Sequence, residues 1–217
     1  MDQYRTFETP NALGPVSLRG MKPFASGGFR DVFIHPEDEA KCIKIAHSRR
    51  AAKAWYLGRS LDGNARELLE YRRLIELKVP YERYFPRLHG EIQTDLGRGV
   101  CVELLRGTDG KLPVNVLEFV KTAEGPAEGI KQFIRDEYRK FWHFCERSLI
   151  LSSSVELRNV GIIQIDGCPK FVSYDVKQTK SRKPIAIADW SVAIKRHRIR
   201  RRFRRNMKKL EARLAMA

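Results

Sequence analysis

Residues 24–33 read FASGGFRDVF, and residues 41–46 read KCIKIA. Their apolar, β-branched character predicts a strand in each stretch, and the turn-forming segment HPEDEA between them predicts that the strands pair. Gly27 and Gly28 precede the first strand, where glycines let the backbone approach a ligand and turn its amides toward phosphate oxygens. An ordinary hairpin turn is the alternative explanation for two adjacent glycines.

Lys44 lies in the middle of the second strand, and Ile43 and Ile45 share the opposite face. A lysine that points inward needs an anionic partner, because an unpaired buried ammonium is very costly. The next predicted helix offers two acids, Glu67 and Glu70, which are three residues apart and are not expected to point the same way. The alternative is that the lysine and both acids face solvent.

Helical spacing predicts a helical stretch over residues 51–77, with an interruption at residues 58–63. Two strands are expected next, at residues 88–94 and 99–105, separated by the turn-forming DLGRG. The apolar face of the helix is expected to consist of Leu68, Leu69, Leu74, Ile75 and Leu77.

Helices predominate in the second half of the chain, with a short one predicted over residues 112–121 and a long one over 127–151. The strands VGIIQI and KFVSYDV then flank an Asp-Gly turn and predict a β-hairpin. This order predicts an α+β fold with a β-rich N-terminal lobe and a mainly α-helical C-terminal lobe. A cleft between two such lobes is a common ligand site.

Asn159 stands just before the first hairpin strand, and Asp175 stands at the end of the second. An amide and a carboxylate at the mouth of a hairpin make an oxygen-rich site suited to Mg²⁺. Each residue also has an ordinary explanation, as a turn asparagine or a cap. Taken in order, the glycine turn, strand lysine, helix glutamate, Asn159 and Asp175 are the components of the protein-kinase fold.

The sequence resembles one family in particular, the PhoP regulatory network protein YrbL family of bacterial kinase-like proteins. The resemblance extends over roughly residues 18–205 and rests on HPEDEAKCIKI (35–45), PRLHGEIQTDLGRGV (86–100), RNVGII (158–163) and YDVKQ (174–178). It implies a two-lobed protein-kinase-like fold. The expected divisions are an N-terminal extension (1–17), an N-lobe (18–105), a C-lobe (106–194) and a basic C-terminal helix (195–217).

The resemblance also implies roles for individual residues, with ATP and Mg²⁺ as the cofactors. Leu104 to Gly107 resemble the linker that receives adenine, so Leu104 and Leu105 are expected to bind the nucleotide. The other implied roles are a phosphate-covering loop (Gly27, Gly28), the lysine that holds the α- and β-phosphates (Lys44), its partner (Glu67) and the metal-holding pair (Asn159, Asp175).

The catalytic loop departs from the kinase pattern. Ser154 stands where the catalytic aspartate is expected, five residues before Asn159, and Ser152 and Ser153 precede it. Glu156 stands where most kinases place a lysine near the transferred phosphate, and a carboxylate there repels phosphate unless it binds a metal ion or acts as the base. General-base help typically contributes about 10²–10⁴-fold, so its loss predicts a slow enzyme.

Three functions remain open. The first is a phosphotransferase that moves the ATP γ-phosphate to a hydroxyl of a protein, a sugar or a small molecule. The second is a pseudokinase, a regulatory or binding module without turnover. The third is a basic interaction protein that docks on acidic partners.

The 217-residue chain has a formal net charge of +16, and the segment from Lys195 to Arg213 supplies +10 of it, with eleven basic residues and one acid. One interpretation of this basic segment is purely structural, a helix with a solvated basic face. The other is functional, docking onto nucleic acid, an anionic membrane or an acidic protein. The tail lacks the interleaved aromatics of single-strand binders. Its expected apolar stripe is Ile199, Phe203, Met207, Leu210 and Leu214.

The four cysteines contain no C-x-x-C pair, which argues against common zinc modules and against a disulfide framework. We therefore expect free thiols and a cytoplasmic location. The chain contains no run of about 18 apolar residues, so the sequence predicts no membrane-spanning helix. The N-terminal residues lack the apolar core of a secretory signal.

Overall fold

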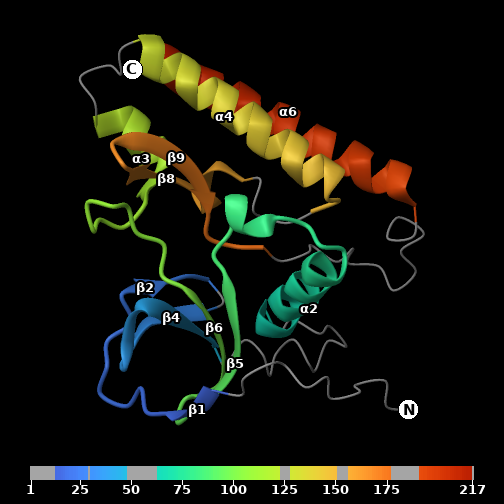
Figure 1. The fold of residues 1–217 in the computed structure, drawn as a ribbon. Helices are drawn as coiled ribbons and strands as arrows, with labels where there is room; N and C mark the ends of the chain where they lie inside the picture. Colours follow the sequence, from blue (N-terminus) through green and yellow to red (C-terminus); the bar gives the residue numbers. More distant parts are fainter. Residues whose placement is uncertain are drawn as a thin grey trace. The chain divides into compact units, whose positions relative to one another are not determined.

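The computed structural model describes residues 13–28, 30–47, 63–122, 128–150, 156–176 and 191–216 (Figure 1). The chain divides into two compact units, which are described separately below. The first unit comprises residues 1–69 and 87–104, and the second comprises residues 70–86 and 105–217. The predicted helical stretch at 51–62 and the loop residues Ser152, Ser153 and Ser154 lie outside the described residues.

A six-stranded sheet forms the first unit, in the order β1-β5-β6-β4-β3-β2. All neighbouring pairs are antiparallel except β1 with β5. Residues 13–16, from the segment expected to be an extension, thus contribute a strand. The strands are β1 (Leu13–Val16), β2 (Ala25–Ser26), β3 (Arg30–His35), β4 (Asp38–Ala46), β5 (Leu88–Thr94) and β6 (Gly97–Glu103).

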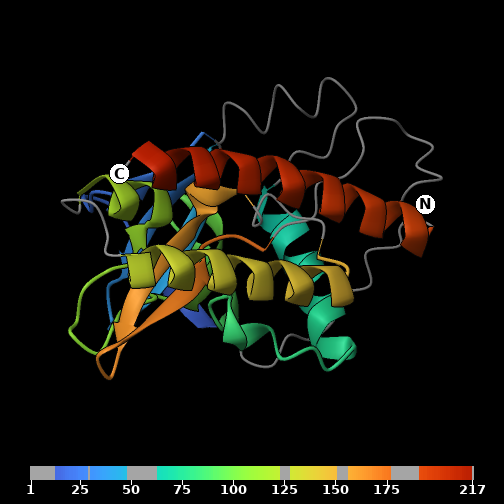
Figure 2. The ribbon, with the colours of Figure 1, turned by 90° about the horizontal axis from the view of Figure 1, so that it is seen from above.

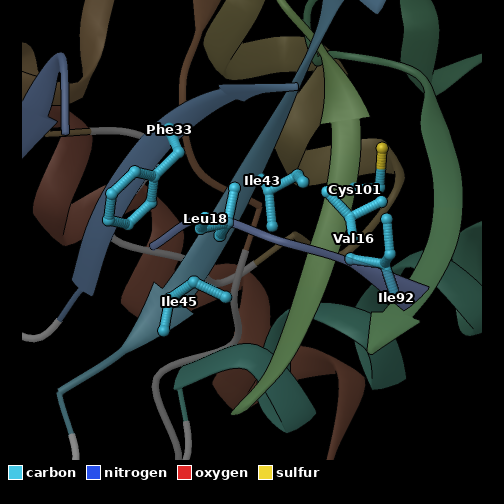
Figure 3. Close-up of a cluster of buried hydrophobic side chains, with 7 residues drawn as sticks. All are labelled: Val16, Leu18, Phe33, Ile43, Ile45, Ile92 and Cys101. Atoms are coloured by element: carbon cyan, nitrogen blue, oxygen red, sulfur yellow. The ribbon is translucent and has the colours of Figure 1, made fainter. Parts of the chain in front are cut away.

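The core of the first unit lies on one face of this sheet (Figure 3). Side chains alternate between the two faces of a strand, so Ile43 and Ile45 of β4 point into the core together. The other members of the cluster come from β1, the segment that follows it, β3, β5 and β6: Val16, Leu18, Phe33, Ile92 and Cys101. Lys44, between the two isoleucines, points to the opposite face.

Helix α2 (Gly63–Glu76) buries a different face from the one expected. Leu69, Ile75 and Leu77 are 51%, 51% and 62% exposed, so these three residues were wrongly assigned to the apolar face. The helical period instead buries Leu68, Tyr71 and Leu74 together with both acids, Glu67 and Glu70. Residues three apart differ by about 60° around a helix, so both acids are buried although they point to different cations: Glu67 contacts Lys44, and Glu70 contacts Arg73.

The second unit is mainly helical and carries a small sheet in the order β7-β8-β9. The predicted hairpin is confirmed: β8 and β9 pair antiparallel around Asp166 and Gly167, which have the positive φ angles that a tight two-residue turn requires. The second unit contains η1 (Tyr81–Arg83), β7 (Val114–Asn115), α3 (Val116–Thr122), α4 (Glu128–Arg147), η3 (Leu157–Asn159), β8 (Val160–Ile165), β9 (Cys168–Ser173) and α6 (Val192–Met216).

Helices α4 and α6 pack against each other and run in opposite directions (Figure 2). Arg135, near the start of α4, pairs with Glu211 near the end of α6 at 3.0 Å. Glu146, near the end of α4, pairs with Arg200 near the start of α6 at 2.6 Å. The predicted apolar stripe of α6 is buried at Ile199, Phe203, Leu210 and Leu214, whereas Asn206 is buried in place of Met207.

The α+β class predicted from the sequence is confirmed by these elements. None of the helices in the described ranges is both long enough and apolar enough to cross a membrane.

Candidate functional site

The first unit brings Lys44 and Glu67 together. Lys44 lies on β4, in the interior of the sheet between β3 and β6, and its Nζ donates a hydrogen bond to Glu67 Oε1 at 2.6 Å. Both side chains are buried. The strand alternation that sends Ile43 and Ile45 into the core leaves Lys44 on the face where α2 supplies the glutamate.

Arg30 is a second cation on the same carboxylate. Its guanidinium contacts Glu67 Oε2 and lies 3.4 Å from Asn64 Oδ1. Sequence reasoning missed Arg30, although strand alternation carries the signal. Val32 pairs with Lys44 in the sheet, and Arg30, two residues before Val32, shares its face.

These two cations keep Glu67 ionised. Burial alone raises the pKa of a carboxyl group, but the charges of Arg30 and Lys44 outweigh burial and hold the pKa of Glu67 below its ordinary value. Asn64 Nδ2 donates to the Lys44 backbone oxygen at 2.9 Å, which ties the first turn of α2 to β4. Arg30, Lys44 and Glu67 therefore form a buried ion-pair cluster and not a surface contact.

The glycine turn lies next to this cluster along the sheet. Gly27 and Gly28 connect β2 to β3, and the Gly27 N–H donates to the Arg30 backbone oxygen at 2.8 Å. The linker residues follow β6. Leu104 is buried and its N–H donates to the Ala40 oxygen at 2.8 Å, whereas Leu105 is half-buried and begins the second unit.

In the second unit, the hairpin brings Asn159 and Asp175 to the same end. Val160 pairs with Ser173 in the sheet, and the Tyr174 N–H donates to the Asn159 backbone oxygen at 3.0 Å. Asp175 follows directly and is 9% exposed. The sequence prediction that these two residues meet at one end of a hairpin agrees with this register.

Asn115 positions the turn that carries Asn159, and sequence reasoning missed it. Its Nδ2 lies within hydrogen-bond distance of the backbone oxygens of Leu157, Arg158 and Val160, at 3.3, 2.9 and 3.3 Å. Its Oδ1 accepts from the Leu117 N–H at 2.9 Å at the start of α3. Asn115 lies inside the helix predicted over residues 112–121, whereas α3 begins only at Val116; the preference of asparagine for helix N-caps was the available signal.

Glu156 forms an ion pair with the basic helix. Its Oε1 lies 3.1 Å from Arg205 on α6, and its Oε2 lies 3.9 Å from Arg158. The Glu156 side chain is 29% exposed and that of Arg205 is 55% exposed. Because 49 residues separate the partners, no local pattern in the sequence could have paired them.

The cysteines give no sign of nucleophilic or metal chemistry. All four thiols are free, as expected, and Cys42, Cys101 and Cys145 are buried. Burial raises the pKa of Cys42 to about 11 and that of Cys101 to about 12, so both thiols stay protonated at neutral pH. Within the described ranges, no three His, Cys, Asp or Glu side chains gather into a metal site.

Comparison with known proteins gives a family match over most of the chain. The family described as PhoP regulatory network protein YrbL matches residues 16–211. The proteins named YrbL in Escherichia coli strain K12 and Shigella flexneri, both described as uncharacterized, are each 26% identical over 145 residues, which is 67% of this chain. This chain spans 64% of the length of those relatives.

A solved structure of the kinase domain of Mycobacterium tuberculosis PknI is also similar. The match has 12% sequence identity and a TM-score of 0.45, and it covers 75% of this chain and 60% of the kinase domain.

Proposed function

The chain belongs to the PhoP regulatory network protein YrbL family, and from this premise we propose that it is a kinase-like protein that binds ATP with Mg²⁺ and moves the γ-phosphate to a hydroxyl acceptor. The observation that carries the proposal is the buried Lys44–Glu67 ion pair. In protein kinases, a strand lysine held by a helix glutamate is one of the two parts that must be in place for phosphoryl transfer.

The surroundings of the pair suit a phosphate ligand. Glu67 fixes the Lys44 ammonium on the sheet, so little side-chain entropy remains to be lost when the ammonium contacts an anion. The Gly27–Gly28 turn leads into the neighbouring strand β3, where its backbone would approach and cover the phosphates. In this proposal Lys44 holds the α- and β-phosphates, and Leu104 and Leu105 contact the adenine.

Asn159 and Asp175 would hold the metal ion. An amide oxygen and a carboxylate are hard donors of the kind Mg²⁺ prefers, and Mg²⁺ usually completes its shell with phosphate oxygens and water. The ion would neutralise charge that develops on the transferred phosphoryl group. Asn115 would act as a positioning residue for Asn159 through the three carbonyls that its amide holds.

A regulatory module that binds nucleotide without turnover is the second candidate. What favours it is the ion pair between Glu156 and Arg205. The contact with Arg205 holds the Glu156 carboxylate toward α6, so Glu156 is not free to take the place of the missing catalytic aspartate. The two candidates share the nucleotide site and differ only in phosphate transfer.

Thermal unfolding with and without Mg²⁺-ATP tests the shared proposal. A ligand at about 100 times its Kd stabilises the folded state by about 2.7 kcal/mol, which for a chain of this length raises Tm by about 5–10 °C. Chelation of Mg²⁺ should remove most of this shift. No shift at millimolar Mg²⁺-ATP would contradict nucleotide binding, and release or transfer of labelled γ-phosphate then separates the enzyme from the binding module.

Reversal of the charge of Arg205 should weaken nucleotide binding. In Arg205→Glu, a second carboxylate would stand beside Glu156 and repel the phosphates, and we expect about a tenfold increase in Kd for Mg²⁺-ATP. The double variant Glu156→Arg/Arg205→Glu re-forms the ion pair with opposite polarity and should restore binding. Titration calorimetry measures both values.

Lys209→Glu is the matched control, because it makes the same change of charge at an exposed position of the same helix. Its Kd should stay within about twofold of the wild-type value, since charges beyond a Debye length of about 10 Å are screened. Equal weakening in Lys209→Glu and Arg205→Glu would mean that only the net charge of α6 matters.

A further inference from the structure

A basic groove runs between α4 and α6 on the second unit. It contains a cavity of about 450 Å³ whose lining includes Trp142, His143 and Arg147 from α4 and Arg196, Arg200 and Arg204 from α6. A second cavity of about 330 Å³ shares His143 and Arg147 and is also lined by Arg83 and Lys140. We call the larger cavity the α4–α6 groove; the smaller one has no α6 residue in its lining.

The groove carries more positive than negative charge. Glu146 is the acid in the lining of the larger cavity, and it pairs with Arg200 at 2.6 Å. No carboxylate in the described part of the chain lies within ion-pair distance of Arg147, Arg196 or Arg204. Three guanidinium groups therefore face the cavity beyond the one that Glu146 neutralises, and guanidinium groups bind phosphate oxygens in bidentate fashion.

The arginines on α6 form a row rather than a single point. Arg196, Arg200 and Arg204 are spaced four residues apart, which places them on one side of the helix at steps of about 6 Å. A row of cations with this spacing suits a chain of repeated phosphates better than one isolated phosphate. Arg147, at the last turn of α4, faces this row across the cavity.

The groove also provides an aromatic surface, which the basic tail alone lacks. The Trp142 ring stacks on Phe203 of α6, with centroids 4.3 Å apart and an angle of 12°. The ring of His143, on the same helix, has its centroid 4.2 Å from that of Trp142, and His143 is exposed. Nucleic-acid bases stack on aromatic rings beside basic grooves when the strand is single, because the bases are then free of a partner strand.

A membrane surface is the poorer fit. A helix that lies in a membrane interface needs a free apolar face. The apolar stripe of α6 is buried: Ile199, Phe203, Leu210 and Leu214 are at most 8% exposed. The large apolar side chains of α6 that are exposed lie in its first and last turns, at Val192, Ile194 and Met216.

The geometry points to the α4–α6 groove as a binding site for single-stranded nucleic acid, in which Arg147, Arg196 and Arg204 contact phosphates of the strand and His143 stacks on a base. This site uses none of the residues assigned to ATP, and it stands whether or not the chain transfers phosphate.

Fluorescence anisotropy with a labelled oligothymidine strand of about 20 nucleotides tests the proposal on the full chain. Three phosphate contacts predict a slope of about −2 in a plot of log K against log salt concentration, or about a twentyfold loss of affinity between 50 and 200 mM salt. Arg196→Glu/Arg204→Glu should weaken binding about a hundredfold and flatten the slope. His143→Ala should weaken it about tenfold, the effect of losing one stacked base.

Lys209→Glu/Arg213→Glu is the matched control, because both residues are exposed on α6, lie outside the cavity lining and make the same change of charge. Its affinity should stay within about fivefold of wild type, and each variant must keep the wild-type Tm. Equal loss in both pairs would overturn the proposal. So would equal affinity for a duplex of the same length, or tighter binding to phosphatidylserine vesicles than to the strand.

Discussion

Replacement of Glu67 by alanine is expected to lower the free energy of unfolding by about 3–5 kcal/mol. The variant leaves Arg30 and Lys44, which are 8% and 5% exposed, without the carboxylate that both contact. Removal of one partner from a buried ion pair costs this much because an uncompensated charge stays in a poorly solvated place. Urea-induced unfolding followed by circular dichroism measures the change.

Glu91→Ala provides the matched control. Glu91 pairs with Arg98 on the same sheet, but the Arg98 side chain is 73% exposed. Exposed pairs contribute about 0–1 kcal/mol, so this variant should unfold almost as the wild type does. A Glu67→Ala effect no larger than the Glu91→Ala effect would show that the Lys44–Glu67 pair is not a buried structural unit.

The same carboxylate predicts a pH dependence. Its folded-state pKa lies below the ordinary value of 4.5, because the attraction of Arg30 and Lys44 outweighs burial. A lowered pKa means that Glu67 stabilises the fold fully above pH 4.5 and loses this contribution as the pH falls below that value. In Glu67→Gln the unfolding free energy should be lower at pH 7 and should fall less between pH 7 and acid than in the wild type.

In the first unit, the sequence pattern predicted one part of the ion-pair cluster and left another open. Lys44 was predictable because the isoleucines on both sides define its face, and β4 in fact buries both faces. The choice between Glu67 and Glu70 was not predictable from spacing, since both acids are buried and each has its own cation. Glu67 contacts Lys44 and Arg30, whereas Glu70 contacts Arg73 at 2.5 Å.

The second unit shows why the sequence did not predict the contacts between distant segments. The hairpin was readable from its Asp-Gly turn and its two short strands, and this also placed Asn159 near Asp175. Trp142 meets Phe203 because α4 and α6 pack against each other, and Arg205 meets Glu156 because α6 also passes the segment before η3. A hydrophobic stripe predicts that a helix is covered but not which helix covers it, so contacts between distant segments stayed hidden.

Lys44→Met and Asp175→Asn are each expected to abolish the stabilisation by Mg²⁺-ATP, a loss of about 2.7 kcal/mol at a ligand concentration of about 100 times the wild-type Kd. Methionine keeps much of the volume of Lys44 and removes its charge. The unliganded variant should still fold, because Arg30 continues to neutralise Glu67. Asparagine keeps the shape of Asp175 and removes the charge that would hold Mg²⁺.

The controls are chosen on the same elements. Lys41→Met changes a partly exposed lysine three residues away on β4, and Asp166→Asn changes an exposed aspartate in the turn of the hairpin that leads to Asp175. Each variant is compared with its own unliganded Tm, so a general loss of stability does not count as a loss of binding.

If Lys44→Met keeps the full nucleotide shift while Asp175→Asn loses it, the metal-holding residues bind ATP without the strand lysine. The buried Lys44–Glu67 pair then serves only to stabilise the sheet and α2. If both variants keep the shift, ATP binds elsewhere, and the kinase-like assignment of these residues fails.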